Sequence, residues 1–297
     1  MTEAPIRRSG IVAVVGRPNT GKSTLVNAAV GTKVSIVTDK PQTTRAAVRG
    51  VLTSGEVQIV FTDTPGFHKP RTLLGQRLNR TVSESVEQVE AVVLVVDAAA
   101  GVGRGDRFVA ERQVAPASCL KVCAVNKVDL VKRARLVEQL DLAARLADFD
   151  HVVPVSARKG AGVADLVGVL AAAMPEGPAY FPPGQVTDQP EELRIAETVR
   201  EKALELTREE VPHSVAVQVD ELEREDDLLR VRCLVLVERE SQKGIVIGKG
   251  GLMLKRIGTL ARTELEGVLG VRIFLELRVK VLKEWQRDER ALAQLGY

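Results

Sequence analysis

The chain is poor in the residues that several kinds of site require. Aromatic residues make up 3% of its 297 residues, which argues against a nucleic-acid platform that stacks bases on rings. Its three cysteines (Cys119, Cys123 and Cys233) are odd in number and lie in apolar runs without a neighbouring histidine, so we expect neither a disulfide framework nor a zinc site. The longest apolar run, Ala91–Gly103, contains Asp97 and is too short to cross a bilayer. These absences predict a soluble, cytoplasmic protein with reduced thiols.

Composition and charge predict two domains. Hydrophobic residues make up 45% of the chain, enough for a sizeable core, and chains of this length tend to divide. Residues 1–175 hold 23 Lys and Arg against 16 Asp and Glu, whereas residues 176–297 hold 19 against 23. Within that acidic half, residues 243–287 hold ten basic and four acidic residues. A basic stretch inside an acidic domain indicates a directed anion-binding surface.

The first half of the chain alternates between strand-like and helix-like patterns. Runs of Val, Ile, Leu and Ala, typical of strands buried in a parallel sheet, occur at Gly10–Val15, Ala46–Leu52, Val57–Thr62, Ala91–Asp97, Leu120–Asn126 and His151–Ser156. Helical patterns lie between most of them, at Gly21–Val30, Leu74–Val89, Asp106–Val114, Lys132–Ala147 and Val163–Met174. The sequence therefore predicts a doubly wound, mostly parallel α/β domain. The second and third runs are joined only by Thr53–Glu56, so they should form an antiparallel hairpin.

A proline-rich segment, Pro175–Pro190, follows and is typical of a semi-rigid linker. We predict a first domain at residues 8–175, a linker at 176–190 and a smaller α+β domain at 191–297. The elements expected in the smaller domain are Glu191–Glu209 (helix), Ser214–Val219 and Leu228–Val237 (strands), Ser241–Ile247 and Leu252–Leu269 (helices), Val271–Leu282 (strand) and Trp285–Leu292 (helix). The first of these helices mixes charges, which favours a solvated face, and Asp220–Asp227 favours an acidic turn.

The strongest motif is the octapeptide Gly16–Ser23, which fits G-x-x-x-x-G-K-[ST] between an apolar strand and a helix. Such a turn points several backbone N–H groups into one concavity that suits phosphate oxygens. Lys22 would reach the β- and γ-phosphates, and the Ser23 hydroxyl would bind Mg²⁺. The residues expected to contact a nucleotide here are Gly16, Arg17, Pro18, Asn19, Thr20, Gly21, Lys22 and Ser23.

A second motif, Asp63-Thr64-Pro65-Gly66, closes the third strand. At that carboxyl end Asp63 can hold the Mg²⁺ shell and the Gly66 N–H can face the γ-phosphate. Upstream, a threonine of the polar stretch Thr38–Arg45 can reach Mg²⁺ only when γ-phosphate is present, which predicts a switch. We favour Thr44 over Thr43. The predicted metal ligands are Ser23, Thr44 and Asp63, and the predicted catalytic residues are Lys22, Thr44, Asp63 and Gly66.

The base is predicted from Asn126-Lys127-Val128-Asp129, at the end of another strand. The Asp129 carboxylate can accept two hydrogen bonds from guanine, whereas adenine offers no such donor pair. Asn126 would brace the loop, and the Lys127 stem would cover the base. A further strand ends at Ser156-Ala157, which can direct a backbone N–H at the guanine carbonyl. These residues predict GTP and GDP as the ligands.

Phe67 follows Gly66, at the place where Ras has the glutamine that orients the attacking water. Phenylalanine cannot orient water, so we expect slow intrinsic hydrolysis. Asn19 is a candidate to hold K⁺ beside the phosphates.

The wider sequence resembles the Era family of bacterial ribosome-assembly GTPases, within the translation-factor-like class. The resemblance rests on Gly16–Asn19, Gln42–Arg45, Asp63–Gly66 followed by His68-Lys69-Pro70, and the long run Val237–Gly251. It implies a C-terminal type II KH domain that binds small-subunit ribosomal RNA near its 3′ end. It also implies a role in small-subunit maturation and occasional peripheral association with the inner face of the cell membrane. We expect a monomer.

The residues themselves support an RNA-binding module. Gly248-Lys249-Gly250-Gly251 is a G-x-x-G loop between two predicted helices, which in KH domains clamps a nucleotide backbone. The predicted RNA-binding residues are Gly248, Lys249, Gly250, Gly251, Lys255, Arg256 and Arg262. The alternative is a nucleotide-regulated adaptor that docks on a membrane surface or a protein. Salt-sensitive RNA binding distinguishes the two.

Overall fold

The computed structural model describes residues 5–40, 42–70 and 72–297. The chain forms two compact units. One contains residues 5–35, 44–70 and Gly75–Asp188, and the other contains Ile36–Thr43, Thr72–Leu74 and Gln189–Tyr297. None of the helices in the described part of the chain has the length and apolar character that crossing a bilayer requires.

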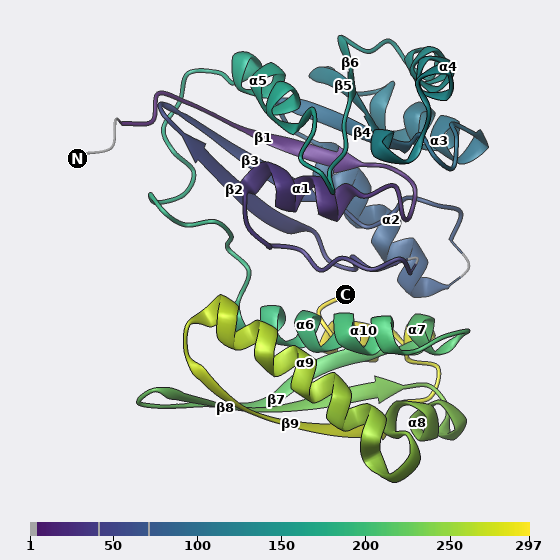
Figure 1. The fold of residues 1–297 in the computed structure, drawn as a ribbon, viewed down its shortest axis with the longest axis vertical. Helices are drawn as coiled ribbons and strands as arrows, with labels where there is room; N and C mark the ends of the chain where they lie inside the picture. The colour runs from purple at the N-terminus through teal and green to yellow at the C-terminus, as the bar shows by residue number, and fades with distance from the viewer. Residues whose placement is uncertain (1–4, 41, 71) are drawn as a thin grey trace. The chain divides into compact units, whose positions relative to one another are not determined.

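The described residues of the N-terminal unit contain a sheet of six strands in the order β2-β3-β1-β4-β5-β6 (Figure 1). The strands are β1 (Arg8–Val15), β2 (Val48–Ser54), β3 (Val57–Asp63), β4 (Ala91–Asp97), β5 (Leu120–Asn126) and β6 (His151–Pro154). β2 runs antiparallel to β3 in a hairpin, and the other pairings are parallel. The predicted doubly wound, mostly parallel sheet is confirmed.

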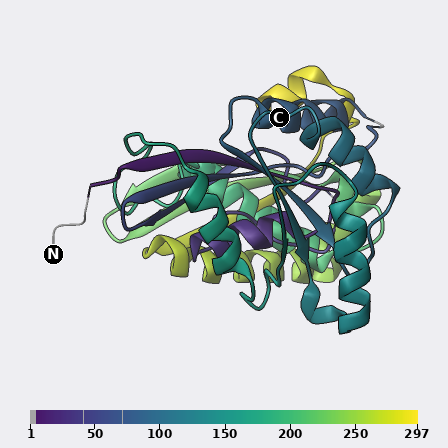
Figure 2. The same cartoon turned by 90° about the horizontal axis from the view of Figure 1, so that it is seen from above.

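Helices cover both faces of this sheet, as Figures 1 and 2 show together. They are α1 (Lys22–Val30), α2 (Leu73–Val86), α3 (Arg104–Val109), α4 (Arg133–Ala144) and α5 (Val163–Ala173). One apolar cluster joins α1 and α5 to the sheet through residues such as Leu25 and Leu166, and a second joins α2, α3 and α4 through Val82, Val109 and Ala143. The helix expected at Asp106–Val114 is α3 continued by a π-helical turn at Ala110–Val114.

This topology positions the candidate site. Strands β1, β3, β4 and β5 lie side by side and parallel, and they end at Val15, Asp63, Asp97 and Asn126. The loops that follow therefore emerge at one edge of the sheet, where α/β proteins bind their ligands.

The C-terminal unit has the helix–strand–strand–helix–helix–strand order expected of a type II KH domain. Its elements are α6 (Glu191–Leu206), α7 (Val211–Ser214), β7 (Ala216–Glu225), β8 (Leu228–Val237), α8 (Glu240–Ile247), α9 (Leu252–Leu269), β9 (Arg272–Val281) and α10 (Glu289–Gln294). The sheet order is β7-β8-β9, with β8 antiparallel to β7 and parallel to β9. Helices α6 and α9 lie on one face of this sheet (Figure 1), over alternate buried residues of β8 such as Leu229, Val231 and Cys233.

Three sequence-based expectations for this unit were wrong. The acidic stretch Asp220–Asp227 is not a turn along its length, because β7 extends to Glu225; acidic side chains of this strand pair with arginines of β8, as in Glu225 with Arg230. The terminal helix is divided, because Asp288 caps a new helix by accepting bonds from two backbone N–H groups. The charged residues of helix α6 do not all lie on a solvated face, because its buried residues include Arg200 and Glu201.

The proline-rich segment is bound to the N-terminal unit along most of its length. Ser9 N donates to Pro175 O, and the Gln58 Oε1 accepts bonds from the N–H groups of residues 180 and 181. Further on, Val51 N donates to Val186 O. The division between the compact units falls after Asp188, within residues 176–190.

Candidate nucleotide site and nucleic-acid groove

The glycine-rich loop connects β1 to the first residue of α1, Lys22. Gly21 caps this helix with φ 92°, a left-handed conformation that favours glycine. A Cβ atom on Gly21 would lie 2.4 Å from Nδ2 of Asn126, so the side chain of the base-reading loop also requires glycine here. The glycine-rich loop therefore packs closely against the predicted base-reading segment Asn126–Asp129.

The side chain of Lys22 hydrogen-bonds to the backbone of the glycine-rich loop. Its Nζ donates to Arg17 O at 2.9 Å and to Gly16 O at 3.2 Å. Burial lowers the pKa of Lys22 to about 8, and the nearby Asp63 opposes that shift. A phosphate bound in the loop would favour the charged ammonium. The lysine is therefore placed to bind an anion.

Three predicted metal ligands meet at one point. The Ser23 and Thr44 hydroxyl oxygens lie 3.0 Å apart, and Thr44 Oγ1 donates to Asp63 Oδ2 at 3.3 Å. Asp63 is fully buried, and its other oxygen, Oδ1, has no hydrogen-bond partner. Burial raises the pKa of Asp63, and the charge of Lys22 opposes this. A buried carboxylate oxygen beside two hydroxyls fits a hard divalent cation such as Mg²⁺.

The structure distinguishes Thr44 from Thr43. The Thr43 hydroxyl lies 2.7 Å from the Thr38 hydroxyl and donates to Lys40 O, within its own segment. The Thr44 hydroxyl instead joins Ser23 and Asp63. The assignment of Thr44 as the metal ligand stays a prediction, which this geometry supports. Pro41, within the same predicted switch, lies outside the described residues.

The loop after β3 lies directly against the phosphate-binding loop. The Thr64 hydroxyl donates to Val14 O at 2.7 Å, and Phe67 N donates to Gly16 O at 3.2 Å. A Cβ on Gly66 would lie 2.7 Å from the backbone of Pro18. Phe67 is buried and stacks on Phe108, with ring centroids 5.4 Å apart. Its ring belongs to the core and offers nothing to an attacking water.

Asn126 ties the remaining loops together. Its Nδ2 donates to Thr20 O at 2.9 Å, and its Oδ1 accepts bonds from Lys127 N at 2.8 Å and Ala157 N at 3.0 Å. The Ser156 hydroxyl donates to Asp129 Oδ1 at 2.6 Å, which orients the carboxylate predicted to read guanine. Val128 connects these residues and donates its N–H to the backbone after β6.

Two aspartates in this site were not predicted. Asp97, at the end of β4, accepts a bond from Lys127 Nζ at 2.6 Å, and the same ammonium donates to Asn19 O. Asp106 is buried and accepts a bond from Arg17 Nε at 2.7 Å. The position of Asp97 at a strand end was a usable signal, since Asp63 and Asn126 have that position too. Asp106 lies on a helix and had no such signal.

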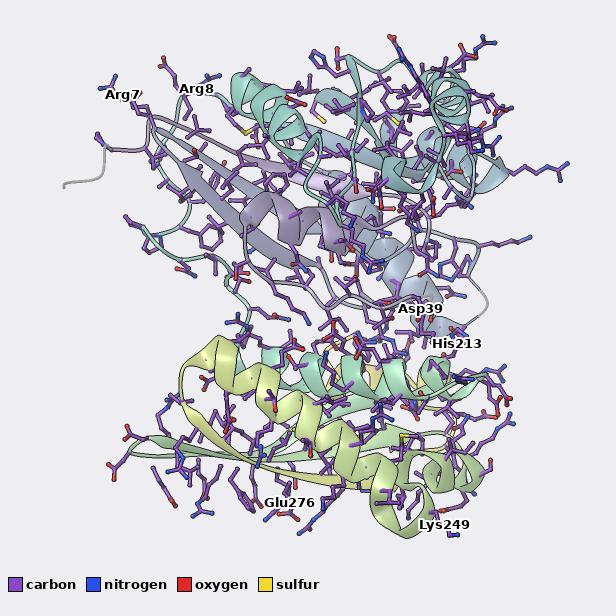
Figure 3. All side chains as sticks on the ribbon, viewed as in Figure 1. Arg7, Arg8, Asp39, His213, Lys249 and Glu276 are labelled. Atoms are coloured by element: carbon purple, nitrogen blue, oxygen red, sulfur yellow. The ribbon has the colours of Figure 1, made fainter. Side chains whose placement is uncertain are left out.

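The C-terminal unit carries a groove of about 410 Å³ between α9 and β9. Its lining residues are Gly251, Leu254, Lys255, Gly258, Thr259, Arg262, Leu275, Glu276 and Leu277. Of the predicted RNA-binding residues, Gly251, Lys255 and Arg262 therefore line the groove. Lys249 is exposed on the preceding loop, where Gly248 and Gly250 have positive φ, and Arg256 is exposed on α9. Figure 3 labels Lys249 on this loop and Glu276 on β9.

The α9 side of this groove could be predicted from the sequence. Leu254, Lys255, Gly258, Thr259 and Arg262 follow the three- and four-residue spacing of one helix face. Arg256 lies about 100° around the helix from Lys255. The β9 side could not be found in this way. On that side, hydrogen bonds from Arg278 and Arg232 lower the pKa of Glu276.

Fold and site together define a P-loop GTPase joined to a KH domain. A family model described as "50S ribosome-binding GTPase" matches residues 11–127, and one described as "KH domain" matches residues 210–286. The chain is 50% identical over 295 residues to GTPase Era of Mycobacterium bovis (strain BCG / Pasteur 1173P2), covering 97% of this chain and 98% of that protein. It is 51% identical over 296 residues to GTPase Era of Mycobacterium avium (strain 104), covering 98% and 99%. The chain belongs to the Era family of GTPases.

Two solved structures match this chain over nearly all of its length. Era in complex with MgGDPNP and nucleotides 1506–1542 of 16S ribosomal RNA matches with a TM-score of 0.95 at 38% identity, covering 98% of this chain and 99% of that one. A variant of Aquifex aeolicus Era bound to GDP and AlF4⁻ matches with a TM-score of 0.94 at 39% identity, with the same coverage. The predicted family, fold class and GTPase activity are confirmed.

Proposed function

We propose that this GTPase is a slow molecular switch that binds small-subunit ribosomal RNA near its 3′ end and assists assembly of that subunit. The observation that carries the RNA assignment is the α9–β9 groove, where Lys255 and Arg262 lie beside an exposed G-x-x-G loop. The Era complex with 16S ribosomal RNA supports it. The functional division that we propose is a GTPase domain at 8–175, a connecting segment at 176–190 and an RNA-binding domain at 191–297.

In the nucleotide site, we propose that Ser23, Thr44 and Asp63 hold Mg²⁺, which would neutralise charge that develops on the phosphates. Lys22 and the backbone N–H groups of Gly16–Ser23 would bind phosphate oxygens, and the Gly66 N–H would contact the γ-phosphate. Asp129 would select guanine through two accepted hydrogen bonds, with its carboxylate held by Ser156.

Slow intrinsic hydrolysis follows from Phe67, whose ring is packed on Phe108. Without a side chain there to orient water, turnover depends on other groups or on a bound partner. A single-turnover hydrolysis rate, measured with and without a 3′-terminal 16S RNA fragment, tests this. A fast rate without RNA would contradict the proposal.

The RNA assignment is tested by equilibrium binding of 3′-terminal 16S RNA to the full chain. Lys255→Glu should weaken binding to RNA of any sequence, because the lost contact is to phosphate. Lys255→Ala should reduce the slope of log affinity against log salt concentration by about 0.7 for each phosphate that Lys255 neutralises on single-stranded RNA. Gly250→Asp adds a negative charge in open space at φ 61°, which aspartate tolerates better than most residues. Arg133→Glu, an equal charge change on α4, is the control. Unchanged binding in the α9 variants would refute the assignment.

The switch itself requires RNA affinities that differ between GDP and a non-hydrolysable GTP analogue. A ligand shifts an equilibrium only through differential affinity, so equal RNA affinities in the two states would contradict switching. Three further expectations stay predictions. K⁺ beside Asn19 should make turnover faster in K⁺ than in Na⁺, peripheral membrane association should appear in vesicle flotation, and sedimentation should show a monomer.

A further inference from the structure

The side chain of Arg17, in the phosphate-binding loop, is held by the segment Gly101–Asp106, which leads from β4 into α3. Arg17 Nε donates to Asp106 Oδ1 at 2.7 Å, and Arg17 Nη2 donates to Gly101 O at 3.3 Å. The Asp106 side chain is fully buried, and its other oxygen, Oδ2, accepts a bond from Gly103 N at 2.9 Å. Arg17 and this segment both lie within the N-terminal compact unit.

The segment is shaped to receive the whole arginine side chain. A Cβ atom on Gly105 would lie 2.3 Å from Cδ of Arg17, so the stem of the arginine packs directly on the backbone of α3. The glycine at this position leaves the space that the stem occupies.

Helix capping does not explain why Asp106 is buried. Capping of α3 uses one oxygen of Asp106, the one that accepts from Gly103 N. Asp165 has the equivalent third position in α5, which also begins after a glycine, and there the aspartate is exposed. Burying a carboxylate is costly unless it is paired and hydrogen-bonded. The burial of Asp106 therefore depends on its second bond, to Arg17.

The backbone of Arg17 in turn holds the lysine of the loop. Lys22 Nζ donates to Arg17 O at 2.9 Å, and Thr20 Oγ1 donates to the same oxygen at 3.1 Å. The residue whose side chain is fixed by Asp106 thus supplies an acceptor that fixes the Lys22 ammonium. Small displacements of a group that must meet a substrate are costly, so the contact with Asp106 bears on phosphate binding.

We propose that Asp106 and Arg17 are positioning residues for phosphate binding. Asp106 holds the Arg17 side chain, and the Arg17 carbonyl holds the Lys22 ammonium where it meets the phosphates. The inference rests on the role of Lys22 in the proposed function. It gives the Arg17 side chain a task within the protein and leaves phosphate binding at this residue to its backbone N–H.

The first test measures the affinity of the full chain for GDP and for a non-hydrolysable GTP analogue. Arg17→Met should weaken both by about tenfold or more, because a hydrogen bond between charged groups is lost. Arg17→Lys keeps the charge but cannot make both bonds of the guanidinium, so its affinities should be intermediate. Arg107 is exposed on α3, and Arg107→Met is the matched control.

A double-mutant cycle tests whether Asp106 acts through Arg17. Asp106→Asn alone should weaken both nucleotides, because the amide has one oxygen and cannot accept from both Arg17 and Gly103. Added to Arg17→Met, it should cause no further loss of affinity. Asp165→Asn, at the equivalent position of α5, is the control for this substitution.

Gly105→Ala displaces the arginine without removing a charge. Alanine favours helix over glycine, but its Cβ would force the Arg17 stem out of its position. Both affinities should fall by about threefold to tenfold, the cost of an off-rotamer side chain, while the circular dichroism stays native. Gly103→Ala is the matched control, because a Cβ there would meet nothing within 4 Å.

Wild-type affinity for both nucleotides in folded Arg17→Met would overturn the inference. So would a further loss of affinity when Asp106→Asn is added, since Asp106 would then act by another route. If Arg17→Met does not fold, Gly105→Ala decides the question, and unchanged affinity in that variant overturns the positioning role. Lys22→Ala separates this inference from the proposed function, because wild-type GDP binding by that variant would contradict the phosphate site itself.

Discussion

Asn126→Ala is the substitution that most directly tests how the nucleotide site is built. Asn126 is 2% exposed and makes three hydrogen bonds, to Thr20 O, Lys127 N and Ala157 N, at 2.8 to 3.0 Å. At about 1 kcal/mol net for each hydrogen bond, their loss should lower the free energy of unfolding by about 3 kcal/mol. The two loops that Asn126 joins would also separate, so binding of GTP and GDP should weaken together.

The assay uses urea unfolding of the nucleotide-free protein, followed by far-UV circular dichroism. The chain has one tryptophan, Trp285, which is buried in the C-terminal unit, so its fluorescence reports that unit separately. The circular dichroism transition should move to lower urea by an amount that corresponds to the loss of these three bonds. A loss below about 1 kcal/mol, the net value of one hydrogen bond, would refute the reasoning, because it would mean that water replaces all three bonds at little cost.

Three further outcomes follow from the structure. Asp129→Asn should shift nucleotide preference from GTP towards XTP with little change in stability, because the amide offers a donor where guanine needs an acceptor. Competition binding measures this preference, and a retained preference for GTP would contradict the prediction. Gly66→Ala should abolish GTP-analogue binding, since its Cβ would lie 2.7 Å from the Pro18 backbone, and wild-type affinity by calorimetry would contradict so close an approach of the two loops. Burial raises the pKa values of Cys123 and Cys233 to about 12. The thiolate is the reactive form, so both should resist alkylation at pH 8 and react fully in denaturant, as mass spectrometry would show.

The positions of the nucleotide-site motifs in the fold could be predicted because each motif is local. Each motif is a short contiguous stretch at the end of a strand, and parallel strands bring such ends to one edge without further information. Asp63 and Asn126 were found in this way. Asp106 was not, because its role depends on the buried contact with Arg17, 89 residues away in sequence.

For a similar reason, the α9 side of the groove between α9 and β9 could be predicted from the sequence, whereas its β9 side could not. Lys255 and Arg262 are seven residues apart on α9, and helical periodicity places both on one face. Glu276 reaches the groove from β9, which pairs with β8 in a register that places Glu276 opposite Arg232. Strand register is set by pairing across the sheet and cannot be read from a single strand.

Helix α6 shows where charge patterns mislead. Its alternation of acidic and basic residues is typical of a solvated surface, yet Arg200 is fully buried. The bond that explains this burial joins Arg200 to a backbone carbonyl at Thr43, 157 residues earlier. Backbone carbonyls carry no residue-specific signal, so no sequence pattern marks the partner. A helix of mixed charge can therefore be a solvated surface, or it can use its charged side chains to bind the backbone of another segment. Only the burial of those side chains distinguishes the two cases.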